Sequence, residues 1–134
     1  MKRVFADTFY FLALLDRRDA HHARVRAWAQ QYRGVLITTR WVLGEVANAL
    51  ADSPVRAAVA RFLRLICEDP GFQIIQDSDA LFENGLTLYE RRPDKAWSLT
   101  DCISIIVMHA EKLDEALTGD RHFTQAGLTA VFAD

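Results

Sequence analysis

Short apolar runs alternate along the chain with longer stretches in which apolar residues recur every three or four positions. The short runs predict strands at 3–6, 35–38, 72–75, 115–118 and 128–132. The longer stretches predict helices at 9–15, 21–32, 41–50, 54–68, 78–89, 99–112 and 122–125. Strands that alternate with helices in this way predict a parallel sheet covered by helices on both faces.

Capping residues mark the starts of three of these helices. Ser53 followed by Pro54 predicts an N-cap and a first turn. Either Asp77 or Ser78 is expected to cap the next helix. Ser98 followed three residues later by Asp101 is a capping-box pattern, and an apolar run follows it. The last of these signals begins the segment that contains most of the candidate chemistry.

The bulk properties indicate an ordinary folded domain. The chain has 134 residues, 51% of them hydrophobic and 25% charged, which is enough for one domain, expected to span 1–134, and excludes disordered and fibrous classes. The net charge of −2 differs from the strongly basic charge of a dedicated duplex-DNA binder. Cys67 and Cys102 have no metal-pair or disulfide-framework spacing, so a reducing cytoplasm is expected. The apolar run at 9–15 is too short to span a bilayer, and no membrane association is expected.

Four acidic residues fall where predicted strands and helices meet. Asp7 directly follows the first strand, and Asp120 follows the fourth strand after one glycine. Asp101 and Glu45 lie near the amino ends of helices that flank the sheet, and Glu45 lies off the apolar stripe of its helix. Sites in open α/β sheets form beyond the carboxyl ends of strands, so we expect the four acids to converge at one edge.

A cluster of carboxylates is costly unless it binds cations, because the charges repel one another. Oxygen ligands suit Mg²⁺ or Mn²⁺, and the chain has no His/Cys set spaced for zinc. Asp101 and Ser104 share a helix face, and Thr100 adds a second hydroxyl beside Asp101. Metal ions held here would activate water and stabilise charge on a phosphate, which predicts metal-dependent phosphodiester hydrolysis.

Structural roles compete with this interpretation at every position. Asp7 and Asp120 are suited to cap helices, Asp101 to complete the capping box, and Glu45 to face solvent. Three other functions remain as alternatives. A receiver-like signalling domain requires paired acids after the first strand and a lysine after the last, and both are missing. A phosphatase requires a second Asp where Phe9 stands, and a catalytically silent RNA-binding module is not excluded by sequence.

Four segments resemble PIN-domain ribonucleases, in particular the VapC-type toxins of toxin–antitoxin pairs. They are Val4–Thr8, the helix with Glu45, the segment WSLTDCIS at 97–104 and LTGDRHF at 117–123. The resemblance spans nearly the whole chain in order and spacing. It implies a three-layer α/β/α sandwich with about five parallel strands and Mg²⁺- or Mn²⁺-dependent RNA cleavage. It also implies a homodimer inhibited by an antitoxin protein.

The resemblance assigns positions to the family's acidic quartet, which are Asp7, Glu45, Asp101 and Asp120. The first, third and fourth acids are expected to hold metal directly or through water, while Glu45 completes the shell or orients the attacking water. Supporting hydroxyls are expected from Thr8 and from Thr100 or Ser104. One departure is Ala96, where related chains often carry a further acid. The expected products carry a 5′ phosphate.

Several other residues have two interpretations. Arg91, Arg92 and Lys95 precede the central segment, and we expect a role in binding substrate phosphates there. The arginines at 17, 18, 24 and 26 are expected to form a solvated face balanced by nearby acids. For His122, a helix-cap or surface role is expected rather than assistance to catalysis. Trp28 and Trp41 either pack in the core or line a groove for an antitoxin helix.

Overall fold

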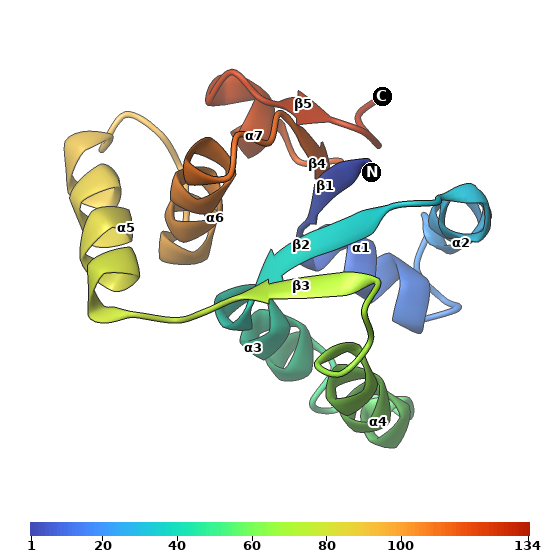
Figure 1. The fold of residues 1–134 in the computed structure, drawn as a ribbon. Coiled ribbons are helices and arrows are strands. Elements are labelled where there is room, and N and C mark those ends of the chain that lie inside the picture. The colour runs from blue at the N-terminus through green and yellow to red at the C-terminus, as the bar shows by residue number, and fades with distance from the viewer.

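The computed structural model describes all residues from 1 to 134 and contains one five-stranded, all-parallel sheet. The strands lie in the order β3-β2-β1-β4-β5, with β1 in the centre (Figure 1). Phe5 of β1 is in register with Ile37 on one side and with Ala116 on the other. The strands are β1 (Arg3–Ala6), β2 (Val35–Thr39), β3 (Phe72–Ile75), β4 (Glu115–Leu117) and β5 (Thr129–Ala130).

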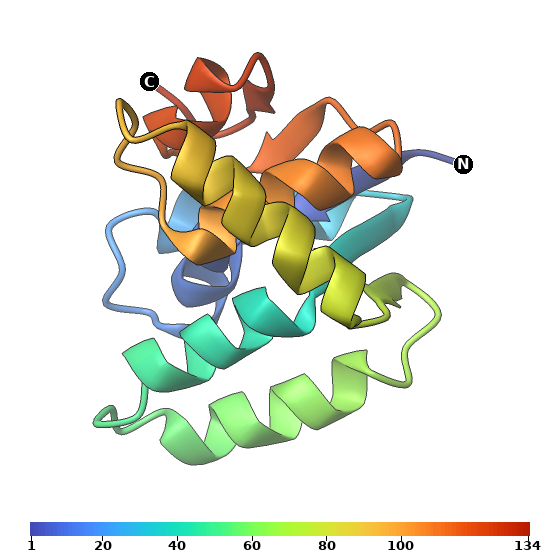
Figure 2. The same ribbon diagram turned by 90° about the vertical axis from the view of Figure 1, so that its left-hand side faces the viewer.

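Helices cover both faces of this sheet. The connections that run outward from β1 to β3 carry α1–α4 on one face, and those that run from β3 through β4 to β5 carry α5–α7 on the other (Figures 1 and 2), as the preference for right-handed crossovers leads one to expect. The predicted α/β/α sandwich is therefore confirmed. The helices are α1 (Thr8–Leu15), α2 (His22–Gln31), α3 (Arg40–Ala49), α4 (Arg56–Ile66), α5 (Asp79–Arg91), α6 (Leu99–Ala110) and α7 (Arg121–Gln125).

Two of the predicted helix caps form as expected. The side chain of Ser78 accepts a hydrogen bond from the backbone N–H of Leu81 and begins α5. Ser98 and Asp101 form a complete capping box at the start of α6. Each cap satisfies backbone donors that have no partner within the helix.

The predicted start of α4 is wrong. Ser53 is not its N-cap, because its hydroxyl accepts a hydrogen bond from the N–H of Val55, only two residues away. Ser53 and Pro54 therefore lie in a turn, and α4 begins at Arg56. The fifth strand is also shorter than predicted, although Val131 and Phe132 still donate to carbonyl groups of Ala116 and Thr118.

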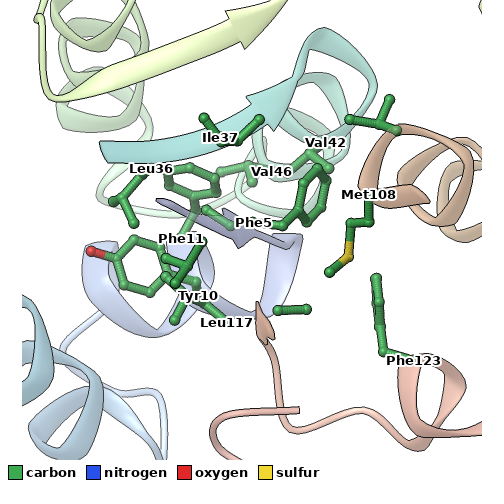
Figure 3. Close-up of a cluster of buried hydrophobic side chains, with 14 of the residues drawn as sticks. Phe5, Tyr10, Phe11, Leu36, Ile37, Val42, Val46, Met108, Leu117 and Phe123 are labelled. Atoms are coloured by element: carbon green, nitrogen blue, oxygen red, sulfur yellow. The ribbon is translucent and has the colours of Figure 1, made fainter. Parts of the chain in front are cut away.

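The core lies on both sides of β1, as expected for a central parallel strand. Phe5 and Phe11 are fully buried on or beside this strand, while Met108 of α6 and Phe123 of α7 close the core from the other face (Figure 3). No helix is long and apolar enough to cross a bilayer. Both cysteines are free thiols.

Candidate active site

The carboxyl ends of β1 and β4 form the centre of the candidate site. These two strands are neighbours, yet the chain leaves β1 toward β2 and leaves β4 toward β5, on opposite faces. Such a divergence is the topological switch point at which open α/β sheets bind ligands. Asp7 follows β1 and Asp120 follows β4, so both acids lie at this point, as the sequence predicted.

Asp7 is buried, with 6% of its surface exposed, and it occupies the N-cap position of α1 without making a side-chain capping bond. Helix capping therefore does not account for this carboxyl group. Burial is the main cause that raises its pKa to about 7, and the negative charges of Asp101 and Glu45 raise it further. The Thr8 backbone N–H and the Thr118 side chain lower the pKa in part. The charges of three of the four predicted acids are therefore coupled.

Glu45 is held by the hydroxyl that the sequence placed beside the first acid. Thr8 Oγ1, in the first residue of α1, donates a 2.6 Å hydrogen bond to Oε1 of Glu45 in α3. A hollow of about 460 Å³ adjoins this pair, and its lining includes Glu45, Thr100 and the exposed Arg40. Glu45 is half-buried, so the interpretation that it is a solvated surface residue is wrong.

Asp101 does complete the capping box, but with only one of its two oxygens. Oδ2 accepts from the backbone N–H of Ser98 at 3.1 Å, while the Asp101 N–H donates to the Ser98 hydroxyl at 3.0 Å. The same Oδ2 lies 2.8 Å from Nδ1 of His122. Oδ1 has no hydrogen-bond partner in the protein, so capping leaves half of the carboxylate available to a ligand.

Asp120 is the N-cap of α7, and it also lies against His122. Its Oδ1 accepts from the His122 backbone N–H at 2.9 Å, and its Oδ2 is 3.3 Å from the His122 Nδ1. The imidazole therefore lies between Asp101 and Asp120 with 28% of its side chain exposed: His122 takes part in the helix cap through its backbone N–H, as predicted, but its ring contacts two acids as well. No local pattern shows this contact, because Asp101 and His122 are separated by 21 positions in the chain.

Thr118 is a site residue that the sequence interpretation missed. It is fully buried, its Oγ1 accepts from the Asp120 N–H at 3.1 Å, and it lowers the pKa of Asp7. One threonine thus links the acids that follow β1 and β4. A hydroxyl two residues before an acid at a strand end was the only sequence signal for this role.

Ser104 is fully buried one helical turn after Asp101, and its Oγ has no hydrogen-bond partner. Buried hydroxyls nearly always have a partner, so Ser104 Oγ is an unsatisfied polar atom that a bound polar group would satisfy. The coupled carboxylates also lack any neighbouring Lys or Arg in an ion pair. The carboxylate and hydroxyl oxygens of this site are therefore ligands of the kind that Mg²⁺ or Mn²⁺ binds.

The same side chains do not form a ready-made metal cage. No group of three or more His, Cys, Asp or Glu side chains lies in an arrangement that would hold a metal ion. The structure therefore brings the four acids to one edge of the sheet without defining metal coordination.

The basic residues before α6 lie next to this edge. Arg92 is paired with Asp94 through two 2.9 Å bonds, which lower the pKa of Asp94 to about 2, and it lies over the Trp97 ring at 5.3 Å. Lys95 makes no ion pair and lines a hollow of about 880 Å³ that also includes Ser98. Arg92 lines the same hollow, but its guanidinium is paired with Asp94, so Lys95 is the cation of this hollow that is free of an ion pair.

The residues predicted for the antitoxin groove are not together. Trp28 packs on Tyr10 and Tyr32 at the edge of the core, as the core-packing interpretation requires. The ring of Trp41 lies tilted against Phe82, with centroids 5.7 Å apart, and it lines the hollow beside Glu45. In the first basic group Arg18 pairs with Asp16, as expected for a balanced, solvated face.

The sequence matches the PIN domain over residues 4–128, so the chain belongs to the PIN-domain family of nucleases. The solved structures that it resembles include VapC20 of Mycobacterium tuberculosis, a toxin that cleaves the sarcin–ricin loop. That match has a TM-score of 0.88 at 23% identity and covers 96% of this chain and 98% of the other. FitAcB of Neisseria gonorrhoeae matches with a TM-score of 0.62 at 16% identity, covering 95% of each chain. A search of curated proteins finds no match. At these identities the structural likeness establishes the fold.

Proposed function

We propose that this protein is a metal-dependent endoribonuclease that hydrolyses RNA phosphodiester bonds and acts as the toxin of a type II toxin–antitoxin pair. The coupling of the carboxylates at the switch point is the observation that carries this proposal. The charges of Glu45 and Asp101 both act on the buried Asp7, and Asp120 is joined to Asp101 through His122. Family membership and the toxin with the same fold support it.

In this proposal Asp7, Asp101 and Asp120 hold Mg²⁺ or Mn²⁺ directly or through water. The metal would neutralise charge on the scissile phosphate and activate a water for attack. Glu45 completes the shell or orients that water, and Thr8 keeps Glu45 in one rotamer through its 2.6 Å hydrogen bond. Release of the 3′ oxygen would leave a 5′ phosphate on the product.

We propose RNA as the substrate and the hollow at Lys95 as part of its binding surface. An unpaired cation beside aromatic side chains suits a flexible RNA strand, since the cation contacts phosphate and the ring stacks on a base. Tyr89, which is 50% exposed, is the ring available for stacking in this hollow, whereas Trp97 also lines it but is buried, with 6% of its surface exposed. Its lining also includes Ser98, whose capping box holds Asp101, so bound RNA would reach the acids.

We further propose that an antitoxin protein binds between α3 and α4 and that the toxin forms a homodimer. A hollow of about 410 Å³ between these helices is lined mainly by apolar residues, with Arg56 and Arg64 among its lining. This lining suits an amphipathic, acidic segment of a partner. Ala60→Glu, at an exposed position of this hollow, is expected to weaken antitoxin binding measured by calorimetry and to leave RNA cleavage unchanged. Light scattering of the purified toxin tests the dimer.

A catalytically silent RNA-binding module is the second candidate. The absence of a preformed group of three metal-holding side chains is the observation that favours it. The two candidates differ in one outcome, which is whether RNA is cut when a divalent metal is supplied.

Cleavage of structured RNA in Mg²⁺ or Mn²⁺ tests the proposal, with EDTA and Asp101→Asn as comparisons. The asparagine keeps the acceptor oxygen for the Ser98 N–H and removes the charge, so the capping box is retained. Asp52→Asn changes an exposed acid outside the site and serves as the matched control. Cleavage that is lost with EDTA and in Asp101→Asn, but not in Asp52→Asn, would support the nuclease. Equal cleavage by Asp101→Asn would refute the role of Asp101, and RNA binding without cleavage would favour the silent module.

A further inference from the structure

We propose that His122 is a positioning residue whose Nδ1–H holds the carboxylate of Asp101 beside Asp120, so that the metal meets a preset pair of acids. This role rests on the proposed nuclease function and deepens it. The residue is neither one of the four acids nor one of the hydroxyls that support them. Its importance comes from a contact between α6 and α7 that only the folded chain makes.

The direction of the hydrogen bond follows from its partners. Nδ1 lies 2.8 Å from Asp101 Oδ2 and 3.3 Å from Asp120 Oδ2, and ionised carboxylate oxygens can only accept. Nδ1 must therefore carry the hydrogen atom and act as the hydrogen-bond donor, primarily to Oδ2 of Asp101. A hydrogen bond to a charged acceptor is among the stronger ones in proteins, so it holds the carboxylate in one orientation.

This bond determines which oxygen of Asp101 is available. Oδ2 receives both the Ser98 N–H and the His122 Nδ1–H, and Oδ1 receives neither. Without His122, the carboxylate would be held only by the single bond from Ser98 and would sample other orientations. A ligand that needs Oδ1 in a fixed place would then have to order it on binding, which lowers affinity.

The imidazole is itself held in place by the core. The next residue, Phe123, is fully buried and packs near Phe5 of β1, with ring centroids 6.5 Å apart. The backbone N–H of His122 is also fixed by its 2.9 Å bond to Asp120 Oδ1. The ring therefore joins the acid after β4 to the acid at the start of α6 through a rigid element of the fold.

General-acid catalysis by His122, in which the imidazole transfers a proton, is the alternative that the experiment must distinguish from positioning. Asparagine places an amide N–H close to the position of Nδ1 but has no proton to transfer at neutral pH. His122→Asn therefore retains positioning and abolishes general-acid chemistry, while His122→Ala abolishes both. Thr124→Ala, at an exposed position of the same helix, is the matched control.

Calorimetric titration with Mn²⁺ on the folded proteins measures positioning without any turnover. We expect His122→Ala to bind Mn²⁺ about 10–100-fold more weakly, as for other residues that orient metal ligands. His122→Asn should recover most of this loss, and Thr124→Ala should match the wild type. Cleavage should follow the same order at limiting Mn²⁺, and His122→Ala should recover its kcat at saturating Mn²⁺.

Each contrary result has a different meaning. Wild-type affinity in His122→Ala would overturn the positioning role while leaving the metal site intact. Equally weak Mn²⁺ binding by His122→Asn and His122→Ala would also overturn it. A low kcat in both variants at saturating Mn²⁺ would overturn it as well, because it would indicate that His122 transfers a proton during catalysis. A wild-type protein that binds no Mn²⁺ would refute the proposed metal-dependent function itself, and this role with it.

Discussion

The hydroxyl of Thr8 donates a 2.6 Å hydrogen bond to Oε1 of Glu45, which joins the first turn of α1 to the middle of α3. The two residues are 37 positions apart in the chain. The bond fixes the one acid of the four that is not next to a strand end or at a helix start. The position of Glu45 at the switch point thus depends on a neutral side chain from another helix.

Replacement of Thr8 by valine tests the importance of this bond. Valine keeps the shape and removes the donor, so we expect metal affinity or cleavage to fall about 10–100-fold, as for other residues that orient metal ligands. Thr8→Ser should restore most of the activity because it restores the donor. Thr87→Val, at an exposed position of α5, is the control. Equal cleavage by wild type and Thr8→Val would show that Glu45 needs no such support.

Asp7→Asn is expected to stabilise the metal-free protein above neutral pH. The pKa of Asp7 is raised from its ordinary 3.8 to about 7, so between these values the folded state binds more protons than the unfolded state. The folded state therefore loses stability as pH rises through this window, by up to about 4 kcal/mol once pH exceeds the folded pKa. Asparagine removes this charge at the cost of the catalytic function.

Urea unfolding in EDTA at pH 5 and pH 8 measures this effect. The gain in the free energy of unfolding from Asp7→Asn should be clearly larger at pH 8 than at pH 5, because Asp7 in the folded wild type is ionised only at the higher pH, whereas in the unfolded chain it is ionised at both. Mn²⁺ should stabilise the wild type more than the variant. A variant that is less stable than the wild type at pH 8 would contradict the assignment of a buried, uncompensated charge.

Lys95→Ala is expected to weaken RNA binding without abolishing the chemistry. Lys95 makes no ion pair and lines the hollow beside Ser98. Its loss should raise the Kd for RNA several-fold and reduce the slope of log K against log salt concentration by about 1. Fluorescence anisotropy in the Asp101→Asn background avoids cleavage during the measurement. Arg61→Ala, on α4 at the other face of the sheet, should leave both quantities unchanged. An unchanged salt slope in Lys95→Ala would exclude a phosphate contact.

Two helical glycines should respond in opposite ways to alanine. At Gly44 of α3 an added Cβ meets no atom within 4 Å, so alanine should stabilise by up to about 1 kcal/mol through its helix propensity. At Gly85 of α5 the Cβ would clash with the side chain of Ile103 in α6, and overpacking costs about 1–3 kcal/mol. Thermal unfolding should therefore show a raised Tm for Gly44→Ala and a lowered Tm for Gly85→Ala. A stabilised Gly85→Ala would mean that α5 and α6 separate easily.

Much of the fold followed from local patterns in the chain. The strands at β1, β2 and β3 and the cap of α6 depend on apolar runs and on hydrogen bonds between residues three positions apart, so a short window contains the necessary information. The start of α4 was predicted incorrectly because Ser53 has two local options, a helix cap and a turn, and the sequence does not rank them.

The sequence by itself determined that Asp7 and Asp120 follow strands and that Asp101 begins a helix, and hence which edge of a parallel sheet these three acids would share. Only the tertiary structure decided how they interact there. The burial that raises the pKa of Asp7, the link through Thr118 and the contact of His122 with Asp101 all join segments that are distant in the chain. They depend on which strands are neighbours and on how α6 and α7 pack across the sheet, and these long-range contacts leave no periodic signal in the sequence.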